Sequence, residues 1–289
     1  MSKIILSFAT LAQGGAARVC ANLSYPLCDT YDEVILVTWA DVPQFYEYDH
    51  RAKWYNLTKE AGGASDIKRM RWFRQLVKRE KPDLILSFLE PFNIRVLLCT
   101  LGLGVKTIVA ERNDPHGVNK YWIMEQFEKL VYRLAKEGYN VKLLHYGRFN
   151  DESISKELRL LKSENIEICG ETDNPQEVLL NADALCMSSL MEGMPMTIIE
   201  AFSVGCPIIS TPVGGCSNMV QDGENGILSE GTDEDSYYRA LCRFMTLSKE
   251  ERKDMRKKAL DSFEKYDIRT TADNYFNLFK EKMDNPCQR

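Results

Sequence analysis

Two glutamates, Glu192 and Glu200, flank the segment of this sequence that is best suited to chemistry. An apolar run at 184–187 precedes them and a helical pattern begins near Thr197, so Glu192 falls on a loop and Glu200 lies about one turn into a helix. Such a pair at the carboxyl end of a strand suits a sugar nucleotide. One carboxylate can accept hydrogen bonds from ribose hydroxyls, while the other meets the sugar near the bond that breaks. The alternative is that Glu200 is a solvated helix residue and Glu192 an ordinary loop residue.

The loop between the two glutamates has the composition of an anion site. Gly193 frees the backbone to turn, and Pro195 sits where a first helical turn tolerates a missing N–H group. The N–H groups of Met196 and Thr197 then point outward at the positive end of the helix. We therefore expect this helix start to bind a phosphate group.

Short β-rich runs alternate with longer helical patterns along most of the chain, which indicates βαβ units and a doubly wound α/β fold. Several runs are continuous in Val, Ile and Leu, as is typical of parallel strands that are buried on both faces. The expected strands are Ile4–Phe8, Val34–Thr38, Leu84–Phe88, Thr107–Ala110, Val141–Tyr146, Ile166–Cys169, Ala184–Met187 and Pro207–Ser210. The expected helices between them are Ala17–Cys28, Asp66–Glu80, Pro91–Thr100, Tyr121–Lys136, Glu152–Lys162 and Thr197–Val204.

This number of strands fits two sheets better than one, so we expect two Rossmann-like domains. No Gly/Ser-rich linker marks the boundary, which we place near Lys136-Glu137-Gly138. The N-terminal domain is then residues 1–136 and the C-terminal domain is residues 137–289. The C-terminal domain ends in three expected helices, Asp233–Met245, Ser248–Phe263 and Thr270–Lys282.

Composition excludes several classes of protein. The 289 residues are 44% hydrophobic and 27% charged, as in a globular protein and unlike a disordered chain. A net charge of −5 argues against nucleic-acid binding, which needs a broad basic surface. The nine cysteines form no CxxC pair, which indicates a reducing cytoplasm. The first apolar run is too short for a signal peptide or a membrane span.

The segment 192–201, Glu-Gly-Met-Pro-Met-Thr-Ile-Ile-Glu-Ala, resembles the E-x7-E signature of the retaining glycosyltransferases of family 4, which have the GT-B fold. Other segments resemble motifs of the same family in the same order, so the resemblance covers most of the chain. They are Gln13-Gly14-Gly15-Ala16-Ala17-Arg18-Val19, Glu111-Arg112-Asn113-Asp114-Pro115, Gly205–Gly215 and Asp222–Leu228.

The resemblance implies roles for the residues of the signature. Glu192 would lie against the transferring sugar as the catalytic residue, and Glu200 would bind the ribose. The turn at Gly193, with backbone groups of Met194 and Pro195, would hold sugar hydroxyls. The positions that would meet the diphosphate are Met196 and Thr197.

The resemblance also implies substrate-binding positions outside the signature. Gly14 and Gly15 would close over the phosphates from the first domain, and Arg112 with Asn113 belongs to the segment after a later strand of that domain. The loop of the second domain near the nucleobase would be Gly170-Glu171-Thr172, with Gly170 and Thr172 as its binding residues.

Compared with the family pattern, this sequence lacks one block. After 127–133 the family continues with a linker and with the first strand and helix of the second domain, a block that carries an Arg and a Lys for the diphosphate. Here the sequence passes directly to Glu137–Gly147, which resembles a later strand. The resemblance therefore implies an internal deletion around the domain junction and a second domain that is shortened at its start.

The missing block leaves two alternatives to an active enzyme. One placed donor can contribute about 3–4 kcal/mol to a transition state, so losing two cations would slow transfer strongly. The chain could then be a catalytically impaired nucleotide-sugar-binding module. It could also fold poorly because a central strand is absent.

Two weaker signals have ordinary interpretations that we favour. Asp233-Glu234-Asp235 resembles the D-x-D metal signature of another glycosyltransferase fold, but its place at an expected helix start indicates a helix cap. Asp66–Glu80 surrounds an apolar stripe with basic residues. It could contact an anionic membrane or a lipid-diphosphate acceptor, or pack its stripe on the sheet as a surface helix, which we favour.

The sequence thus predicts a retaining, hexosyltransferase-type glycosyltransferase of polysaccharide or glycoconjugate biosynthesis. Its donor would be a nucleotide-diphosphate sugar, UDP- or GDP-linked, and its acceptor a glycan or a lipid-linked glycan. We expect no cofactor, no metal and no nucleic-acid partner. The predicted location is the cytoplasm, with peripheral contact at the inner face of the membrane as an option.

Overall fold

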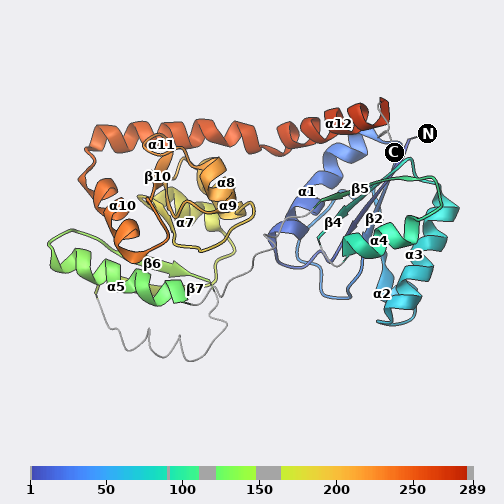
Figure 1. Cartoon of the computed structure of the whole chain (residues 1–289), viewed down its shortest axis with the longest axis horizontal. Helices are drawn as coiled ribbons and strands as arrows, with labels where there is room; N and C mark the ends of the chain where they lie inside the picture. Colours follow the sequence, from blue (N-terminus) through green and yellow to red (C-terminus); the bar gives the residue numbers. More distant parts are fainter. Residues whose placement is uncertain (1, 90–91, 111–121, 148–163, 285–289) are drawn as a thin grey trace. The chain divides into compact units, whose positions relative to one another are not determined.

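The computed structural model describes residues 2–89, 92–110, 122–147 and 164–284 (Figure 1). Two compact units divide the chain: residues 1–113 together with 267–289, and residues 114–266. In both units parallel strands are covered by helices, which confirms the expected fold class of two Rossmann-like α/β domains. The expected helix Glu152–Lys162 lies outside the described residues.

The division differs from the expected boundary between residues 136 and 137. Helix α5 (Trp122–Lys136) belongs to the second unit, because its Leu130 and Leu134 are buried against Tyr237 and Tyr238. Helix α12 (Ile268–Asp284) belongs to the first unit, where Ala272 is buried. An amphipathic stripe shows that a helix packs on a core, but it does not show which of two cores receives it.

The first unit contains one parallel sheet in the order β3-β2-β1-β4-β5. In β1, β2 and β4 at least five consecutive residues are buried, as both-face burial predicts for the centre of such a sheet. The edge strand β3 was not predicted, because its Lys-Trp-Tyr-Asn sequence lacks the Val/Ile/Leu character of the other strands. The strand bounds are β1 Lys3–Phe8, β2 Glu33–Thr38, β3 Lys53–Asn56, β4 Leu84–Phe88 and β5 Lys106–Ala110.

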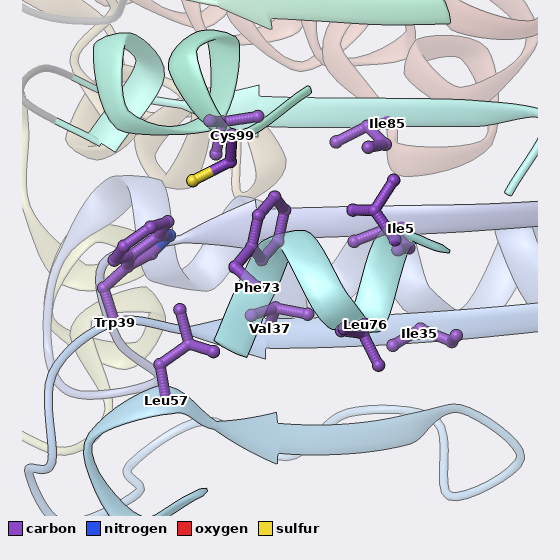
Figure 2. Packing of buried hydrophobic residues seen from close by; sticks show 11 residues of the cluster. Ile5, Ile35, Val37, Trp39, Leu57, Phe73, Leu76, Ile85 and Cys99 are labelled. Carbon is purple, nitrogen blue, oxygen red and sulfur yellow. The ribbon is translucent and has the colours of Figure 1, made fainter. Parts of the chain in front are cut away.

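Helix α3 (Asp66–Glu80) covers this sheet with the predicted apolar stripe. Figure 2 shows Phe73 and Leu76 packed over the side chains of Ile5 and Val37. This confirms the interpretation of α3 as a surface helix packed on the sheet. The other helices of the unit are α1 Gly15–Thr30, α2 Leu57–Glu60 and α4 Phe92–Thr100, in addition to α12.

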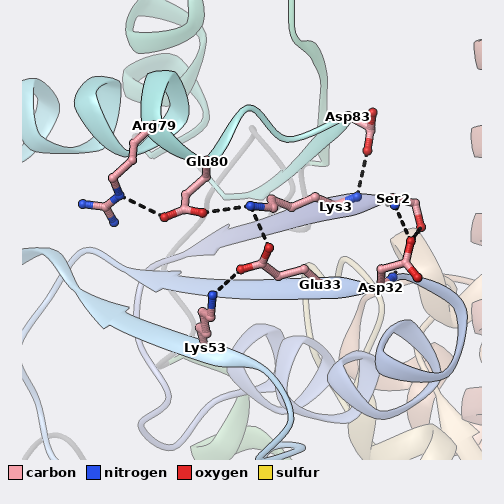
Figure 3. Close-up of polar contacts among 8 residues, drawn as sticks. All are labelled: Ser2, Lys3, Asp32, Glu33, Lys53, Arg79, Glu80 and Asp83. Carbon is pink, nitrogen blue, oxygen red and sulfur yellow. Dashed lines mark hydrogen bonds and ion pairs between the residues drawn. The ribbon is translucent and has the colours of Figure 1, made fainter.

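A cluster of charges ties together the amino ends of strands β1, β2 and β3 and the carboxyl end of helix α3 (Figure 3). The Lys3 ammonium lies 2.7 Å from a carboxylate oxygen of Glu33 and 2.8 Å from one of Glu80. The two carboxylates bind further cations, Lys53 and Arg79. All three central side chains are no more than 21% exposed, so solvent screens these ion pairs less than it screens surface pairs.

Among the described residues of the second unit the strands form two parallel sheets, one of β6 and β7 and one in the order β10-β9-β8. Its strands are β6 Leu143–Tyr146, β7 Ile166–Gly170, β8 Leu185–Met187, β9 Ile208–Ser210 and β10 Gly226–Leu228. Its helices are α5, α7 Pro175–Asn181, α8 Met196–Ser203, α9 Gly214–Met219, α10 Glu234–Thr246 and α11 Lys249–Phe263, followed by the short η1 Glu264–Tyr266.

Candidate functional site

The segment that contains Glu192 and Glu200 joins β8 to α8 in the second unit, as its pattern predicted. The chain leaves β8 at Met187, turns through residues 188–195 and enters α8 at Met196. Pro195 is the residue before the helix, with φ −70° and ψ 115°, and no side chain caps the helix start. The backbone donors of Met196 and Thr197 are therefore not used by a capping side chain, which leaves this positive helix end suited to an anion.

The carboxylate of Glu192 is held by a neighbour that the sequence prediction missed. The Ser189 hydroxyl donates to Glu192 Oε1 at 2.7 Å, and the Thr211 hydroxyl donates to the carbonyl of Ser189. Thr211 follows β9, the strand paired with β8. Because loops after neighbouring parallel strands meet at one edge of the sheet, strand order could have suggested this contact, but no local motif does.

Two glycines at the start of α9 let this helix lie directly against residues 188–195, which we call the glutamate loop. A Cβ atom at Gly214 would lie 1.8 Å from the carbonyl oxygen of Glu192, and one at Gly215 would lie 1.9 Å from that of Gly193. The Gly215 N–H group donates to the Glu192 carbonyl at 3.1 Å. The backbone approach is so close that only glycine fits at both positions.

A cavity of about 590 Å³ opens beside the helix start. Its lining includes the hydroxyl or carboxyl residues Thr172, Ser188, Thr197 and Glu200, which follow β7 and β8. Glu192 is half-buried and does not line this cavity. The structure thus brings Glu200 and Thr197 to one wall with Thr172, while Glu192 lies on the adjoining loop.

Burial favours the uncharged forms of a thiol and an imidazole in the cavity wall. Burial raises the pKa of the Cys186 thiol to about 12, so this thiol is protonated at neutral pH. Burial also lowers the pKa of His145, which favours its neutral form. The cations of the wall, Lys142 and Arg252, contact Glu167 and the Met245 carbonyl respectively.

The remaining predicted residues are distributed over both units. Gly170 ends β7 with φ +77°, and its carbonyl accepts a hydrogen bond of 2.8 Å from Gly147. Gly14 precedes α1 in the first unit with φ +149°, and Gly15 is the first residue of that helix. Gly193 and Met194 are exposed, whereas Pro195 is buried. Arg112 and Asn113 lie outside the described residues.

Asp233 caps helix α10, as the favoured interpretation predicted. Its Oδ1 atom accepts a hydrogen bond of 2.9 Å from the Ser236 N–H group, and its Oδ2 atom accepts one of 2.6 Å from the Ser236 hydroxyl. Within the described ranges, no helix combines the length and apolarity that a bilayer crossing requires.

Residues 114–246 match the protein family described as "Glycosyl transferases group 1". An alpha-1,4-N-acetyl-D-galactosaminyltransferase of Campylobacter jejuni is 25% identical over 314 aligned positions, which cover 81% of this chain and 86% of that protein. A UDP-Gal:alpha-D-GlcNAc-diphosphoundecaprenol alpha-1,3-galactosyltransferase of Escherichia coli is 34% identical over 113 residues, which cover 39% of this chain and 27% of that protein.

Solved structures share the fold at low sequence identity. The lipopolysaccharide outer core galactosyltransferase WaaB superposes with a TM-score of 0.73 at 16% identity, over 98% of this chain and all of that one. Anabaena HepE, solved with UDP and glucose, gives a TM-score of 0.69 at 14% identity, over 97% of this chain and all of that one. The structural likeness establishes the GT-B fold, and the family match with the relatives supports a GT4-like glycosyltransferase.

Proposed function

We propose that this GT4-like chain transfers a sugar from a UDP- or GDP-linked donor to a glycan or lipid-linked acceptor, with retention of anomeric configuration. The observation that carries the proposal is the uncapped start of α8 beside a cavity lined by Glu200 and Thr197. A diphosphate fits the helix end, and a ribose fits a carboxylate one turn further on. The proposed setting is the assembly of a polysaccharide or glycoconjugate, as for the named relatives.

In this proposal each residue of the segment has one task. The N–H groups of Met196 and Thr197 hold the diphosphate, and Glu200 accepts hydrogen bonds from the ribose hydroxyls. Glu192, positioned by Ser189, stabilises the positive charge that develops on the sugar ring. The exposed backbone at Gly193 and Met194 meets the sugar hydroxyls.

The reaction exchanges one bond at the anomeric carbon for another. The bond from this carbon to the donor phosphate oxygen breaks, and a bond to the acceptor oxygen forms on the same face of the sugar. The acceptor proton passes to the departing phosphate oxygen. The helix end and the donor diphosphate thus supply the chemistry, and the proposal requires neither a protein nucleophile nor a metal ion.

A lipid-linked acceptor would bring the protein to a cytoplasmic membrane surface, and α4 has a face suited to it. Its outward residues repeat at helical spacing and are 44–73% exposed: Ile94, Leu97, Leu98 and, just after the helix, Leu101. Arg74 of α3 donates to the carbonyls of Cys99 and Leu101, which places a cation beside this face. We call these four residues the α4 face and propose that it contacts anionic lipid.

The function is tested by transfer assays with radiolabelled UDP- and GDP-sugars, after a thermal-shift screen has identified the donor that stabilises the protein. We expect Glu192→Gln to bind that donor with similar affinity and to lower kcat by on the order of 100-fold, because one electrostatic contribution to the transition state is lost. Leu180→Gln, on the exposed surface of α7, is the control. Donor binding by the wild type without turnover above that of Glu192→Gln would contradict an enzymatic function.

A further inference from the structure

Thr211 is a buried polar residue at the carboxyl end of β9, and no step of the proposed transfer uses it. The residue is 1% exposed. Its N–H group donates to the Met187 carbonyl at 3.1 Å, which continues the pairing of β9 with β8 by one residue. The backbone of Thr211 is therefore fixed at the point where the chain leaves β8 for the glutamate loop.

The side chain of Thr211 extends this attachment into the glutamate loop. A buried hydroxyl needs a hydrogen-bond partner, and that of Thr211 donates to the Ser189 carbonyl. Ser189 lies beyond the end of β8, in irregular backbone, and 22 positions from Thr211 in the sequence. The Thr211 hydroxyl thus ties the irregular backbone of the loop to the regular end of a strand.

This bond fixes the residue that holds the Glu192 carboxylate. The Ser189 hydroxyl donates to Glu192 Oε1 at 2.7 Å. The serine side chain is short and has one heavy-atom torsion, so its hydroxyl reaches the carboxylate only while the Ser189 backbone stays in place. A shift of that backbone would therefore lengthen or break the contact with Glu192.

The chain after β9 also holds the main chain of Glu192. The Gly215 N–H group donates to the Glu192 carbonyl at 3.1 Å. Glu192 is thus attached to residues 211–215 at two points, at its carbonyl directly and at its carboxylate by way of Ser189. Two attachments fix both the position of the residue and the direction of its side chain.

We propose that Thr211 is a positioning residue for sugar transfer, which acts on the Glu192 carboxylate through Ser189. This role rests on the proposed function of Glu192 and identifies the residue outside the glutamate loop on which its geometry depends. A displacement of about 1 Å at a reacting group can cost on the order of 100-fold in rate. A hydroxyl that supplies geometry alone can therefore control kcat.

The variant Thr211→Val removes the hydroxyl with little change of shape, because a methyl group takes its place. We expect kcat to fall by roughly 10- to 100-fold, since the carboxylate is misplaced. The donor Kd should change by less than about threefold, because the donor-binding groups proposed on α8 keep their backbone. Thr211→Ser keeps the hydroxyl and should recover most of the lost kcat. Steady-state kinetics and isothermal titration calorimetry measure these quantities.

Ser229 offers a matched control in the same sheet. It follows β10 as Thr211 follows β9, it is 4% exposed, and its hydroxyl donates to the Gly231 carbonyl at 2.6 Å. Its N–H group donates to the Ser210 carbonyl at 2.9 Å, so its backbone is attached in the same way. Because β10 lies on the other side of β9 from β8, its hydroxyl holds a different loop. Thr211→Val and Ser229→Ala should both lower the melting temperature, but only Thr211→Val should lower kcat.

A double-mutant cycle shows whether Thr211 acts through Glu192. In Glu192→Gln the charge that Thr211 is proposed to position is absent, so adding Thr211→Val should lower kcat by less than about threefold more. A general loosening of the fold would instead lower kcat by the same factor in both backgrounds, since independent effects add in free energy. Adding Thr211→Val to Ser189→Ala should likewise have little effect.

Hydrogen exchange gives a readout that needs no turnover. Thr211→Val should speed deuterium uptake by the backbone of residues 188–195, because the loop loses its bond to the strand end, whereas Ser229→Ala should not. Absence of transfer by the wild type would contradict the proposed function alone, and the exchange contrast would still show whether Thr211 holds the loop.

Four outcomes would overturn the proposal. They are wild-type kcat in Thr211→Val, equal losses of kcat in Thr211→Val and Ser229→Ala, a Thr211→Val loss that is undiminished in the Glu192→Gln background, and unchanged deuterium uptake by the glutamate loop.

Discussion

Single atoms decide the geometry of the glutamate loop. At Gly215 the nearest atom to an added Cβ is a backbone oxygen, that of Gly193, and backbone cannot rotate aside as a flexible side chain can. At Gly223 an added Cβ would meet no atom within 4 Å, although its φ of +77° still favours glycine. A substitution at Gly215 therefore disturbs the contact with the glutamate loop, whereas a substitution at Gly223 strains only the local backbone.

We expect Gly215→Ala to lower sugar transfer by on the order of 100-fold, because a loop displaced by about 1 Å misplaces Glu192 and the sugar beside it. Gly223→Ala should lower the melting temperature without this loss of kcat. The measurement is kcat and KM on protein shown to be folded by circular dichroism. Unchanged kinetics in Gly215→Ala would mean that contact between the start of α9 and the glutamate loop does not position the site.

At the scale of elements, α3 packs on the sheet, which is the favoured one of the two alternatives that the sequence left open for this helix. The apolar side chains Phe73 and Leu76 of α3 are buried against the sheet. One basic residue of α3, Arg74, lies near an exposed apolar surface, which is the α4 face. Membrane contact, the alternative not favoured for α3, thus becomes a proposal for α4 with Arg74 beside it.

We expect the double variant Leu98→Glu and Leu101→Glu to bind vesicles of mixed neutral and anionic phospholipid at least about tenfold more weakly than the wild type, since apolar area is lost and negative charge is added. The measurement is vesicle cosedimentation at several salt concentrations. Leu180→Glu, which changes a leucine of similar exposure in the second unit, is the matched control. Equal binding of the double variant and the wild type would exclude the α4 face as the contact.

At the scale of the whole molecule, stability rests partly on the charge cluster around Lys3. Hydrogen bonds from Lys3 are the largest cause that lowers the pKa of Glu33 and of Glu80 below the ordinary value of 4.5. For Lys3 itself burial opposes the charge, but the two carboxylates outweigh it and raise its pKa above 10.5. Carboxylates with lowered pKa stabilise the fold above their ordinary pKa, and this contribution is lost as the pH falls through the folded values.

We therefore expect Lys3→Met to be about 1 kcal/mol less stable than the wild type at pH 7. The difference should shrink as the pH falls below the ordinary carboxylate pKa of 4.5 and through the lowered pKa values of Glu33 and Glu80. On the alkaline side the difference should shrink only above the raised pKa of Lys3. Urea unfolding at a series of pH values measures the stability difference on the acidic and on the alkaline side. Lys59→Met, which removes a more exposed pair with Asp41, is the control, and a difference independent of pH would contradict the electrostatic cause.

The sequence by itself determined the type of each long element. Continuous Val, Ile and Leu runs predicted the central strands of both units, and the acidic start of α10 predicted its cap, because both signals arise from neighbours along the chain. The segment from Glu192 to Glu200 could also be assigned to a strand–loop–helix turn from local residues alone. The strands β3 and β10 were missed, since Lys-Trp-Tyr-Asn and Gly-Ile-Leu lack the longer Val/Ile/Leu runs that marked the central strands.

Only the tertiary structure decided which elements meet. It assigned α5 to the second unit and α12 to the first, brought Gly215 against Glu192, and left Glu192 outside the lining of the cavity that holds Glu200. It also left β6 and β8 without a strand between them among the described residues. The reason is physical: side-chain periodicity records that a surface will be buried, but the partner that buries it is selected by contacts between residues far apart in the chain.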